Sequence, residues 1–435
     1  MSASAQLEGQ WKAGVAKVKI TPDEPIWMAG YAARTKPSEG VQTDLYLKVL
    51  ALDDGSGRSA VLVTTDLVGL RRQVADKIAE RCAKQYGITR DRLAINSSHT
   101  HSGPTTGEFA SRAGYDEQKQ VVRRYTDQLI EKAVTTVGEA LQNMRPARLE
   151  FAQGFAGFAV NRRRAYVGMR GLPAPVDHDV PVLAVRSVDD SPQAVIFGYA
   201  CHNTTLGSYQ INGDYAGYAQ EALEKIYPGV TALFVLGCAG EANPLPRYQG
   251  TDPALTHYSL ELVSMYGRIL AASVDLTLHG KMRPVTGPLK TAFERVDIPF
   301  EKTPSQSELQ ARVKARDSNI RAQAERMLRA KERYGKLPER YPEPVQVWQF
   351  GHSLKFIALG GEAVVDYSLR LKAQHGWEDT WVAAYSNDVF GYVPSARVLK
   401  EGGYEAQGGD GGSFSAATED IIVEKVRELV RRTAP

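Results

Sequence analysis

The feature that most restricts the fold of this chain is a recurring unit: a short apolar run, a polar or glycine-rich loop, then an amphipathic stretch with helical spacing. Thr231–Leu236 is a clear case, because this apolar run leads directly into Gly237-Cys238-Ala239-Gly240. Strands that alternate with helices in this way are typical of α/β proteins. We therefore expect a mixed α/β fold, with a β-sheet core flanked by helices, as a single domain over residues 6–435.

Periodicity and turn residues predict the individual elements. Leu45–Asp53 and Ala60–Thr65 flank Asp54-Gly55-Ser56-Gly57, which predicts a β-hairpin. A helix over 71–86 should end at Gly87, and a polar helix over 305–334 is expected to form an outer arm or lid. The other predicted strands are 11–20, 93–97, 147–152, 182–188, 194–200, 231–236, 354–359 and 381–385, and the other predicted helices are 118–142, 215–227, 254–278, 364–375 and 418–432.

Composition excludes several classes of protein. Of the 435 residues, 43% are hydrophobic and 24% are charged, which is typical of a folded domain and not of a disordered or fibrous chain. The formal net charge is +3, with no concentrated basic face of the kind that binds nucleic acid. No apolar window approaches the roughly 18 residues of a transmembrane helix. The three cysteines (Cys82, Cys201 and Cys238) form neither a disulfide framework nor a cysteine-rich zinc site.

The start of the chain bears on its location. Ala3-Ser4-Ala5, just before Gln6, is similar to the small-residue end of a signal-peptide cleavage site. One explanation is a secreted or periplasmic protein whose signal peptide has been trimmed. A small-residue tail without meaning explains it equally well, and a cytoplasmic location stays open.

The candidate chemistry centres on His99-Thr100-His101, which follows a predicted strand. Two histidines two residues apart lie on the same side of an extended segment. They can share a metal ion, or one can bind the metal while the other transfers protons. The pair alone is weak evidence, since His-x-His occurs often by chance.

The sequence around this pair resembles the zinc-site signature of the neutral ceramidase family. Further segments of that family's catalytic domain are matched in the same order, from about Gly14 to about Tyr404, and six ordered matches are far more specific than one. The matching residues are Asn96-Ser97-Ser98-His99-Thr100-His101-Ser102-Gly103-Pro104, Val160-Asn161-Arg162, Tyr199-Ala200-Cys201-His202, Gly361-Glu362, Gly391-Tyr392-Val393 and Tyr404.

The resemblance implies a zinc ion held by His99, His202, Glu362 and Tyr392. Two nitrogens and two oxygens suit zinc, and an open coordination position would hold a water whose pKa falls to about 7. The resemblance further implies that His101 carries the proton from this nucleophile to the leaving nitrogen. Two more residues, Arg162 and Tyr404, would then donate hydrogen bonds to the developing oxyanion.

Each of these residues also has an ordinary structural explanation. His202 is consistent with a core histidine at a strand end, and Glu362 with a cap for the helix near Val364. The two tyrosines could simply pack on a surface, and Arg162 could belong to a solvated arginine run. Asp66 follows an apolar run, so it either orients a zinc histidine or merely ends a strand.

The chain departs from the family pattern at two places. The family has a serine, proposed as important for activity, where this chain has Ala242, so attack by zinc-bound water is favoured over any role for a serine hydroxyl. Cys238 nearby has no basic neighbour in sequence and is expected to be a buried residue, not a nucleophile. Only about 30 residues follow Tyr404, too few for the family's C-terminal β-sandwich of about 100 residues. We therefore expect the catalytic domain without that sandwich.

The leading functional hypothesis is a zinc-dependent hydrolase that cleaves the amide bond of an N-acyl compound, ceramide-like lipids included. The alternatives are a zinc esterase or lactonase on the same centre, and a non-catalytic metal-binding or ligand-binding relative. The expected partner is a small or lipid-like substrate, whose identity depends on the loops around Tyr31, 109–115, 163–175 and 247–258. The sequence leaves the oligomeric state open.

Overall fold

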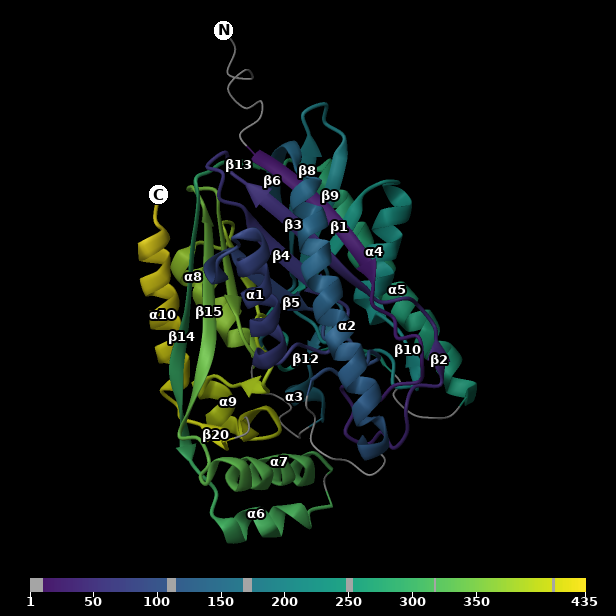
Figure 1. Ribbon diagram of the computed structural model, residues 1–435, viewed down its shortest axis with the longest axis vertical. Helices are drawn as coiled ribbons and strands as arrows, with labels where there is room; N and C mark the ends of the chain where they lie inside the picture. The colour runs from purple at the N-terminus through teal and green to yellow at the C-terminus, as the bar shows by residue number, and fades with distance from the viewer. Residues whose placement is uncertain (1–10, 108–114, 167–173, 248–252, 317, 409–410) are drawn as a thin grey trace.

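Figure 1 shows the computed structural model of the chain, which describes residues 11–107, 115–166, 174–247, 253–316, 318–408 and 411–435. Two large sheets dominate it. The first has the strand order β11-β9-β8-β6-β1-β3-β4-β5, with β13 also paired to β6. The second has the order β18-β16-β15-β14-β20. The expected mixed α/β fold, with a sheet core flanked by helices, is confirmed.

The elements have the following bounds. The strands are β1 (Trp11–Lys19), β2 (Gly40–Val41), β3 (Tyr46–Asp53), β4 (Ala60–Thr65), β5 (Leu93–Ser97), β6 (Arg145–Phe155), β7 (Ala159–Asn161), β8 (Asp179–Ser187), β9 (Pro192–Tyr199), β10 (Gln210–Ile211), β11 (Thr231–Leu236), β12 (Ala242–Pro244), β13 (Arg283–Val285), β14 (Leu289–Lys302), β15 (Arg340–Phe350), β16 (Leu354–Leu359), β17 (Glu362–Ala363), β18 (Thr380–Ala383), β19 (Tyr392–Val393) and β20 (Ser413–Phe414). The α-helices are α1 (Arg72–Tyr86), α2 (Tyr115–Gln142), α3 (Arg162–Tyr166), α4 (Asp214–Ile226), α5 (Pro253–His279), α6 (Gln306–Val313), α7 (Ser318–Tyr334), α8 (Val365–His375), α9 (Ala396–Glu401) and α10 (Thr418–Thr433), and the 3₁₀ turns within the described residues are η2 (Arg90–Arg92) and η3 (Glu405–Gln407).

The strands of the first sheet are apolar on both faces, because both faces are covered. On β3, Val49 and Ala51 pack toward α1 and α2, whereas Leu50 and Leu52 point to the opposite side. That opposite side meets one face of the second sheet across a core rich in tryptophan, which includes Trp348. The outer face of the second sheet is covered by α8 and α10, which lie along it in Figure 1.

The two ends of the first sheet approach each other through Asn96 on β5. Its Oδ1 accepts a hydrogen bond from Leu236 N–H on β11 at 2.9 Å, although β5 and β11 are at opposite ends of the strand order. Its Nδ2 donates to the Ala384 carbonyl at 2.7 Å and contacts Ser386 Oγ at 3.0 Å. One buried amide therefore ties together both edges of the first sheet and a loop of the second.

Most predicted elements are present, one expectation is wrong, and two strands were missed. The polar segment 305–334 forms two helices, α6 and α7, instead of one; Ser305 caps the first with a capping box. These helices have a small core of their own, formed by Leu309, Ala324, Met327 and Leu337. The strands β14 and β15 were not predicted, although they pair over eleven residues and form the middle of the second sheet.

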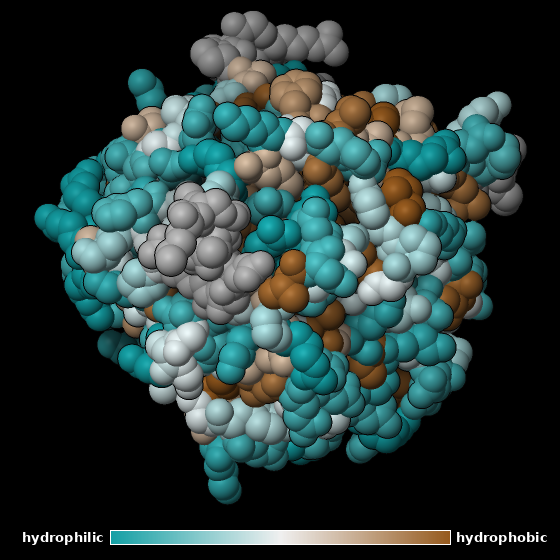
Figure 2. Space-filling model, turned by 90° about the horizontal axis from the view of Figure 1, so that it is seen from above, coloured by the Kyte–Doolittle hydropathy of each residue, from teal (hydrophilic) through white to brown (hydrophobic). Residues whose placement is uncertain are grey.

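The described surface is mixed in character. Large apolar side chains are exposed on it, including Phe155, Trp377 and Leu276. Figure 2 shows a face on which apolar residues are interspersed with hydrophilic ones. Among the helices in the described residues, none is both long enough and apolar enough to span a bilayer.

Candidate metal centre

His99 and His202 follow β5 and β9, so the ends of two strands of the first sheet deliver them. His99 takes a left-handed backbone conformation with φ of 62°, which few residues other than glycine adopt. The His202 N–H donates to the Ala242 carbonyl at 2.9 Å, which fixes the histidine against β12. Both imidazoles are buried, with His99 3% and His202 0% exposed.

Glu362 and Tyr392 reach the same place from the second half of the chain. They lie opposite each other in the short parallel pair formed by β17 and β19. The Glu362 N–H donates to the Gly391 carbonyl at 2.8 Å. The preceding Gly361 has φ of 57° and would bring a Cβ to 2.8 Å from the Gly391 oxygen, so glycine is needed there.

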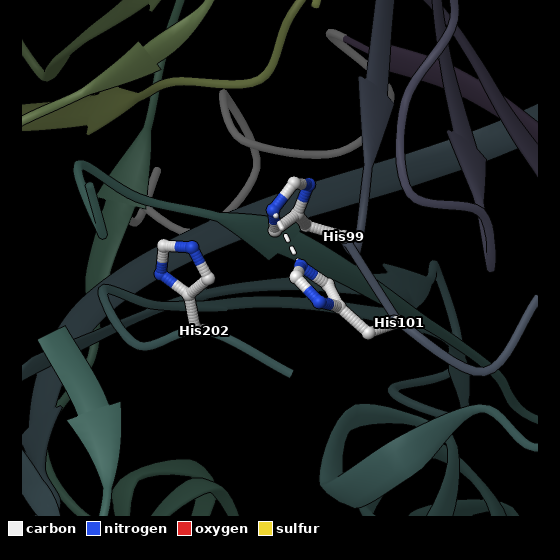
Figure 3. Close-up of side chains that lie close together, drawn as sticks. All are labelled: His99, His101 and His202. Atoms are coloured by element: carbon white, nitrogen blue, oxygen red, sulfur yellow. Dashed lines mark hydrogen bonds between the residues drawn. The ribbon is translucent and has the colours of Figure 1, made fainter. Parts of the chain in front are cut away.

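The side chains converge on the Glu362 carboxylate. Its Oε2 lies 3.2 Å from His99 Nε2 and 3.2 Å from His202 Nε2. The third histidine, His101, places its Nε2 3.0 Å from His99 Nε2. Figure 3 shows the three imidazoles grouped together, and one nitrogen of each lies within 4.8 Å of the others. The structure thus brings together three of the four ligands that the sequence analysis expected, with His101 beside them.

Hydrogen bonds at the far side of the two rings make this cluster suitable for a cation. His99 Nδ1 donates to the Val68 carbonyl at 2.5 Å, and His202 Nδ1 donates to the Ala239 carbonyl at 2.7 Å. A carbonyl only accepts, so each neutral ring has its proton on Nδ1 and a lone pair on Nε2. Two lone pairs and a carboxylate oxygen therefore face one another, an arrangement that a metal ion stabilises.

Electrostatics keep the cluster in the forms that bind a metal. Burial, and after it the charge of Arg162, lowers the pKa of His202 to about 4. Burial alone would raise the pKa of Glu362, but His99 and His202 hold it well below its usual range. At neutral pH the site therefore presents a neutral His202 and an ionised carboxylate.

His101 differs from the other two histidines in its contacts. Burial, and then His99 and His202, lowers its pKa well below the usual 6.5. Its Nδ1 is buried without a hydrogen-bond partner among the described residues. The Tyr31 ring packs against it in an edge arrangement, with 4.8 Å between ring centroids. A neutral imidazole with a buried unpartnered nitrogen can take up a proton.

Arg162 connects the cluster to the tyrosines. Its Nη2 donates to the Tyr392 hydroxyl at 2.9 Å and to the Gly240 carbonyl at 3.0 Å, and its Nε donates to Glu405 Oε1 at 2.8 Å. The Tyr404 ring stands edge-on to Tyr392 at 5.2 Å, and 42% of Tyr404 is exposed. Burial raises the pKa of Tyr392, while Arg162 acts in the opposite direction by favouring the phenolate.

The other residues considered in the sequence analysis make their contacts outside the cluster of histidines and Glu362. Asp66 does not orient a histidine: its carboxylate accepts hydrogen bonds from Tyr46 N–H at 2.9 Å and Gln220 Nε2 at 3.0 Å. Ala242 is buried and pairs with Asn161 between β12 and β7. The three cysteines are buried and form no disulfide, and burial raises the pKa of Cys238 far above its ordinary value.

Sequence reasoning missed Tyr385, Glu405 and Glu241. The Tyr385 ring lies 4.5 Å from the His99 ring, and Glu405 bonds both Arg162 and Arg163. Glu241 Oε2 accepts from Val365 N–H at the start of α8. The position of Glu405 next to Tyr404 was a usable signal, whereas the only signals for Tyr385 and Glu241 were their places at the end of one predicted strand and shortly after another.

The fold and this cluster define a class of protein: a mixed α/β protein in which two sheets bring histidines and a carboxylate into one group able to hold a metal ion. A sequence profile described as "Neutral/alkaline non-lysosomal ceramidase, N-terminal" matches residues 11–243. The chain belongs to this family, as the resemblance at His99, His101 and His202 indicated.

Individual relatives support the same assignment. Neutral ceramidase A of Dictyostelium discoideum is 25% identical over 240 residues, which are 52% of this chain and 33% of the relative. Neutral ceramidase of Drosophila melanogaster is 25% identical over 237 residues, which are 51% of this chain and 33% of the relative. The matched region therefore spans about a third of the length of these relatives.

Solved structures share the fold over nearly the whole chain. A structure described as a ceramidase complexed with C2 covers 98% of this chain and 76% of its own, with a TM-score of 0.77 and 19% identity. Neutral ceramidase from Pseudomonas aeruginosa gives a TM-score of 0.76 at 19% identity, over 98% of this chain and 75% of its own.

Proposed function

We propose that this chain is a zinc-dependent hydrolase that cleaves the amide bond of an N-acyl substrate, ceramide-like lipids included. The observation that carries the proposal is that His99 Nε2 and His202 Nε2 both face Glu362 Oε2. The Nδ1 proton of each histidine is donated to a backbone carbonyl, so neither Nε2 carries a proton. Tyr392, opposite Glu362 in the β17–β19 pair, would complete the ligand set. Bound zinc would supply Lewis acidity and lower the pKa of a coordinated water to about 7.

His101 is proposed to move the proton. Amide hydrolysis needs a group that accepts a proton from water and returns it to the nitrogen, because an unprotonated amine leaves poorly. The His101 imidazole is neutral at neutral pH and lies beside His99, with 4.7 Å between ring centroids. It is therefore placed to act first as base and then as acid.

Arg162 and Tyr404 are proposed to stabilise charge on the substrate oxygen. Hydrogen-bond donors fixed before the reaction stabilise an oxyanion strongly in a site that excludes water. Arg162 is held in place by Glu405, and its guanidinium carbon lies 5.9 Å from the Tyr404 ring centroid. The same guanidinium favours the ionised form of Tyr392 and so supports its proposed role as a metal ligand.

The substrate class rests on the relatives, which are ceramidases by name. Parts of the loops expected to shape the pocket (108–114, 167–173 and 248–252) lie outside the described residues. The site draws His99 and His202 from the first sheet and Glu362 from the segment between β16 and β18 of the second, which supports one catalytic domain rather than two.

The test combines metal analysis with a matched substrate panel. Purified protein, loaded with zinc and dialysed, should retain about one zinc per chain, and His99→Ala should lose it. N-acyl amides, ceramide among them, should be hydrolysed with zinc and not after chelation. His101→Ala should keep zinc and lose about 10²–10⁴-fold in kcat, the range typical of a general acid–base group.

Each part of the proposal can fail separately. Turnover of matched esters but of no amide would replace the amidase assignment with a zinc esterase. Hydrolysis that survives both His99→Ala and His101→Ala would exclude the mechanism. Zinc binding without turnover of any amide or ester in the panel would leave a metal-binding relative that is not a hydrolase.

A further inference from the structure

Tyr385 has a buried hydroxyl that no group in the described structure satisfies. Its side chain is 0% exposed, and its hydroxyl has no hydrogen-bond partner among the described residues. Other buried tyrosines nearby are satisfied: Tyr199 donates to the Ala156 carbonyl at 2.7 Å, and Tyr367 to the Pro394 carbonyl at 3.1 Å. An unmade hydrogen bond of this kind opposes folding.

The backbone at Tyr385 is strained as well. Its φ is 50°, in the left-handed region where a bulky residue is a genuine outlier, and Asn387 has φ of 66°. Such conformations persist when the surroundings determine them, and they gather at functional sites. Here the Asn387 side chain is fixed through Oδ1, which accepts from Ile95 N–H at 3.1 Å, and through Nδ2, which donates to Gln346 at 2.8 Å.

Main-chain bonds of Tyr385 join the two segments that carry the proposed ligands. Its N–H donates to the Gly361 carbonyl at 3.0 Å, one residue before Glu362. Its carbonyl accepts from Ser97 N–H at 3.2 Å, two residues before His99. The ring then lies against the centre, with centroids 4.5 Å from His99 and 6.1 Å from His202.

We propose that Tyr385 is a further catalytic residue, whose hydroxyl donates a hydrogen bond to an oxygen that enters the centre formed by His99, His202 and Glu362. The acceptor is either a water held there with zinc or the carbonyl oxygen of the substrate. Both present the same chemistry to a phenol. The inference rests on the hydrolase activity proposed above, although its first readout does not need that activity.

The phenol is suited to donate and not to ionise. A phenol has an ordinary pKa of about 10. The O–H therefore stays intact at neutral pH. The two unfavourable features, a hydroxyl without a partner and a backbone outlier, then have one explanation. Tyr385 is held in a conformation in which its hydroxyl gains a hydrogen bond only when an oxygen enters the centre.

The test is Tyr385→Phe, which keeps the ring and removes only the hydroxyl. In metal-free protein the thermal midpoint of the variant should equal or exceed that of the wild type, because the lost group made no bond. With zinc chloride and an N-acyl amide, kcat should fall by about 10²-fold, the typical cost of removing a fixed donor. If water is the acceptor, the rise in midpoint on adding zinc alone should shrink. If substrate is the acceptor, that rise should be unchanged.

Tyr125→Phe is the matched control, because the Tyr125 phenol is buried and donates to the Ile20 carbonyl at 2.8 Å, away from the centre. It should lower the midpoint and leave kcat unchanged. The inference is overturned if Tyr385→Phe lowers the metal-free midpoint, as Tyr125→Phe should. It is also overturned if the variant matches the wild type in both the zinc-induced rise and kcat. If the wild type hydrolyses no substrate, that result would instead count against the proposed function. The zinc-induced rise in thermal midpoint would still test Tyr385.

Discussion

Arg162 donates a hydrogen bond from Nη2 to the Tyr392 hydroxyl at 2.9 Å, which links a residue at the start of α3 to one on β19. The guanidinium is held on its other edge by Glu405, so its direction is fixed before any substrate binds. A positive charge beside a phenol favours the phenolate, and a charge held in advance stabilises an oxyanion at little reorganisation cost. One arginine thus supports both a proposed ligand and a proposed substrate contact.

Glu405→Gln should therefore reduce activity without touching the metal cluster. The change removes the charge that fixes Arg162 at 2.8 Å and that also pairs with Arg163 at 2.6 Å. We expect kcat to fall by about 10–100-fold, as for residues that orient other active groups. Unfolding should become easier by about 3–5 kcal/mol, because buried arginines lose their partner. Steady-state kinetics and denaturant titration measure the two effects.

Glu401→Gln is the control for this change. Glu401 bonds Arg163, Arg164 and Arg397 within the same network. Its loss should cost stability but leave most of kcat, because in the described structure its ion pairs are with Arg163, Arg164 and Arg397 and not with the guanidinium of Arg162. Equal losses of kcat in both variants would show that Glu405 acts only on stability.

Gly30→Ala should disturb His101. A Cβ at Gly30 would lie 2.4 Å from His101 Cγ, and Gly30 has φ of 94°. The imidazole must move to make room, and a misplacement of about 1 Å can cost about 10²-fold in rate. Zinc content should stay the same, because His101 is not a proposed ligand. Kinetics and metal analysis together check this separation.

Gly57→Ala separates the clash from backbone strain. Gly57 has φ of 75°, and an added Cβ would meet no atom within 4 Å. The variant should lose about 1–2 kcal/mol of stability from the left-handed conformation and keep its activity. If Gly30→Ala behaves like Gly57→Ala in both respects, then contact with His101 is not important.

The sequence predicted the local parts of this fold better than the long-range ones. Thr231–Leu236 and Leu354–Leu359 are bounded by glycine or polar turns, so their limits as β11 and β16 were readable from neighbours in sequence. The strands β14 and β15 were missed because charges and prolines interrupt their apolar residues. The two strands pair with each other across α6 and α7, from Pro299 with Arg340 to Leu289 with Phe350, and no local pattern records a partner so far along the chain.

The candidate site also has residues that local motifs reveal and features that depend on distant contacts. His99, His202, Glu362 and Tyr392 were found through motifs beside them, and the structure brings the first three within contact. For Asp66 the sequence left two roles open, because a carboxylate after a strand gives no sign of its partner. In the structure Asp66 follows the end of β4 and accepts a hydrogen bond from Gln220, 154 residues away. The strain and the unpartnered hydroxyl at Tyr385 exist only in the folded chain.

Acid should weaken the metal-free protein through His202. The folded pKa is about 4, below the ordinary 6.5 that an unfolded chain would have. Between these values the unfolded state binds a proton that the folded state does not, so the free energy of unfolding falls as pH drops from 6.5 to 4. The full effect is about 3 kcal/mol. His101, whose pKa is also lowered, acts in the same direction.

Denaturant titrations of metal-free protein between pH 7.5 and pH 4.5 measure this loss. His202→Asn removes the titrating group and should flatten part of the dependence. His279→Asn changes an exposed histidine, whose side chain is 71% accessible, and should not. Identical pH dependence in the wild type and His202→Asn would contradict the assignment.

Asn96→Leu should open the arrangement that brings His99 and His202 together. The side chain is 1% exposed and bonds Leu236 on β11 and Ala384 after β18. Leucine has a similar volume but leaves the buried Leu236 N–H without the Asn96 acceptor and removes one of the two hydrogen bonds at the Ala384 carbonyl, which costs about 2–4 kcal/mol. Because the edges β5 and β11 lose their link, zinc affinity should also fall.

Asn143→Leu is the control, because its exposed amide makes a single hydrogen bond of the same kind, to the Val15 carbonyl at 3.0 Å. This change should cost less than about 1 kcal/mol and leave zinc affinity unchanged. A loss of stability in Asn96→Leu with unchanged zinc affinity would mean that the histidines hold their positions without this link.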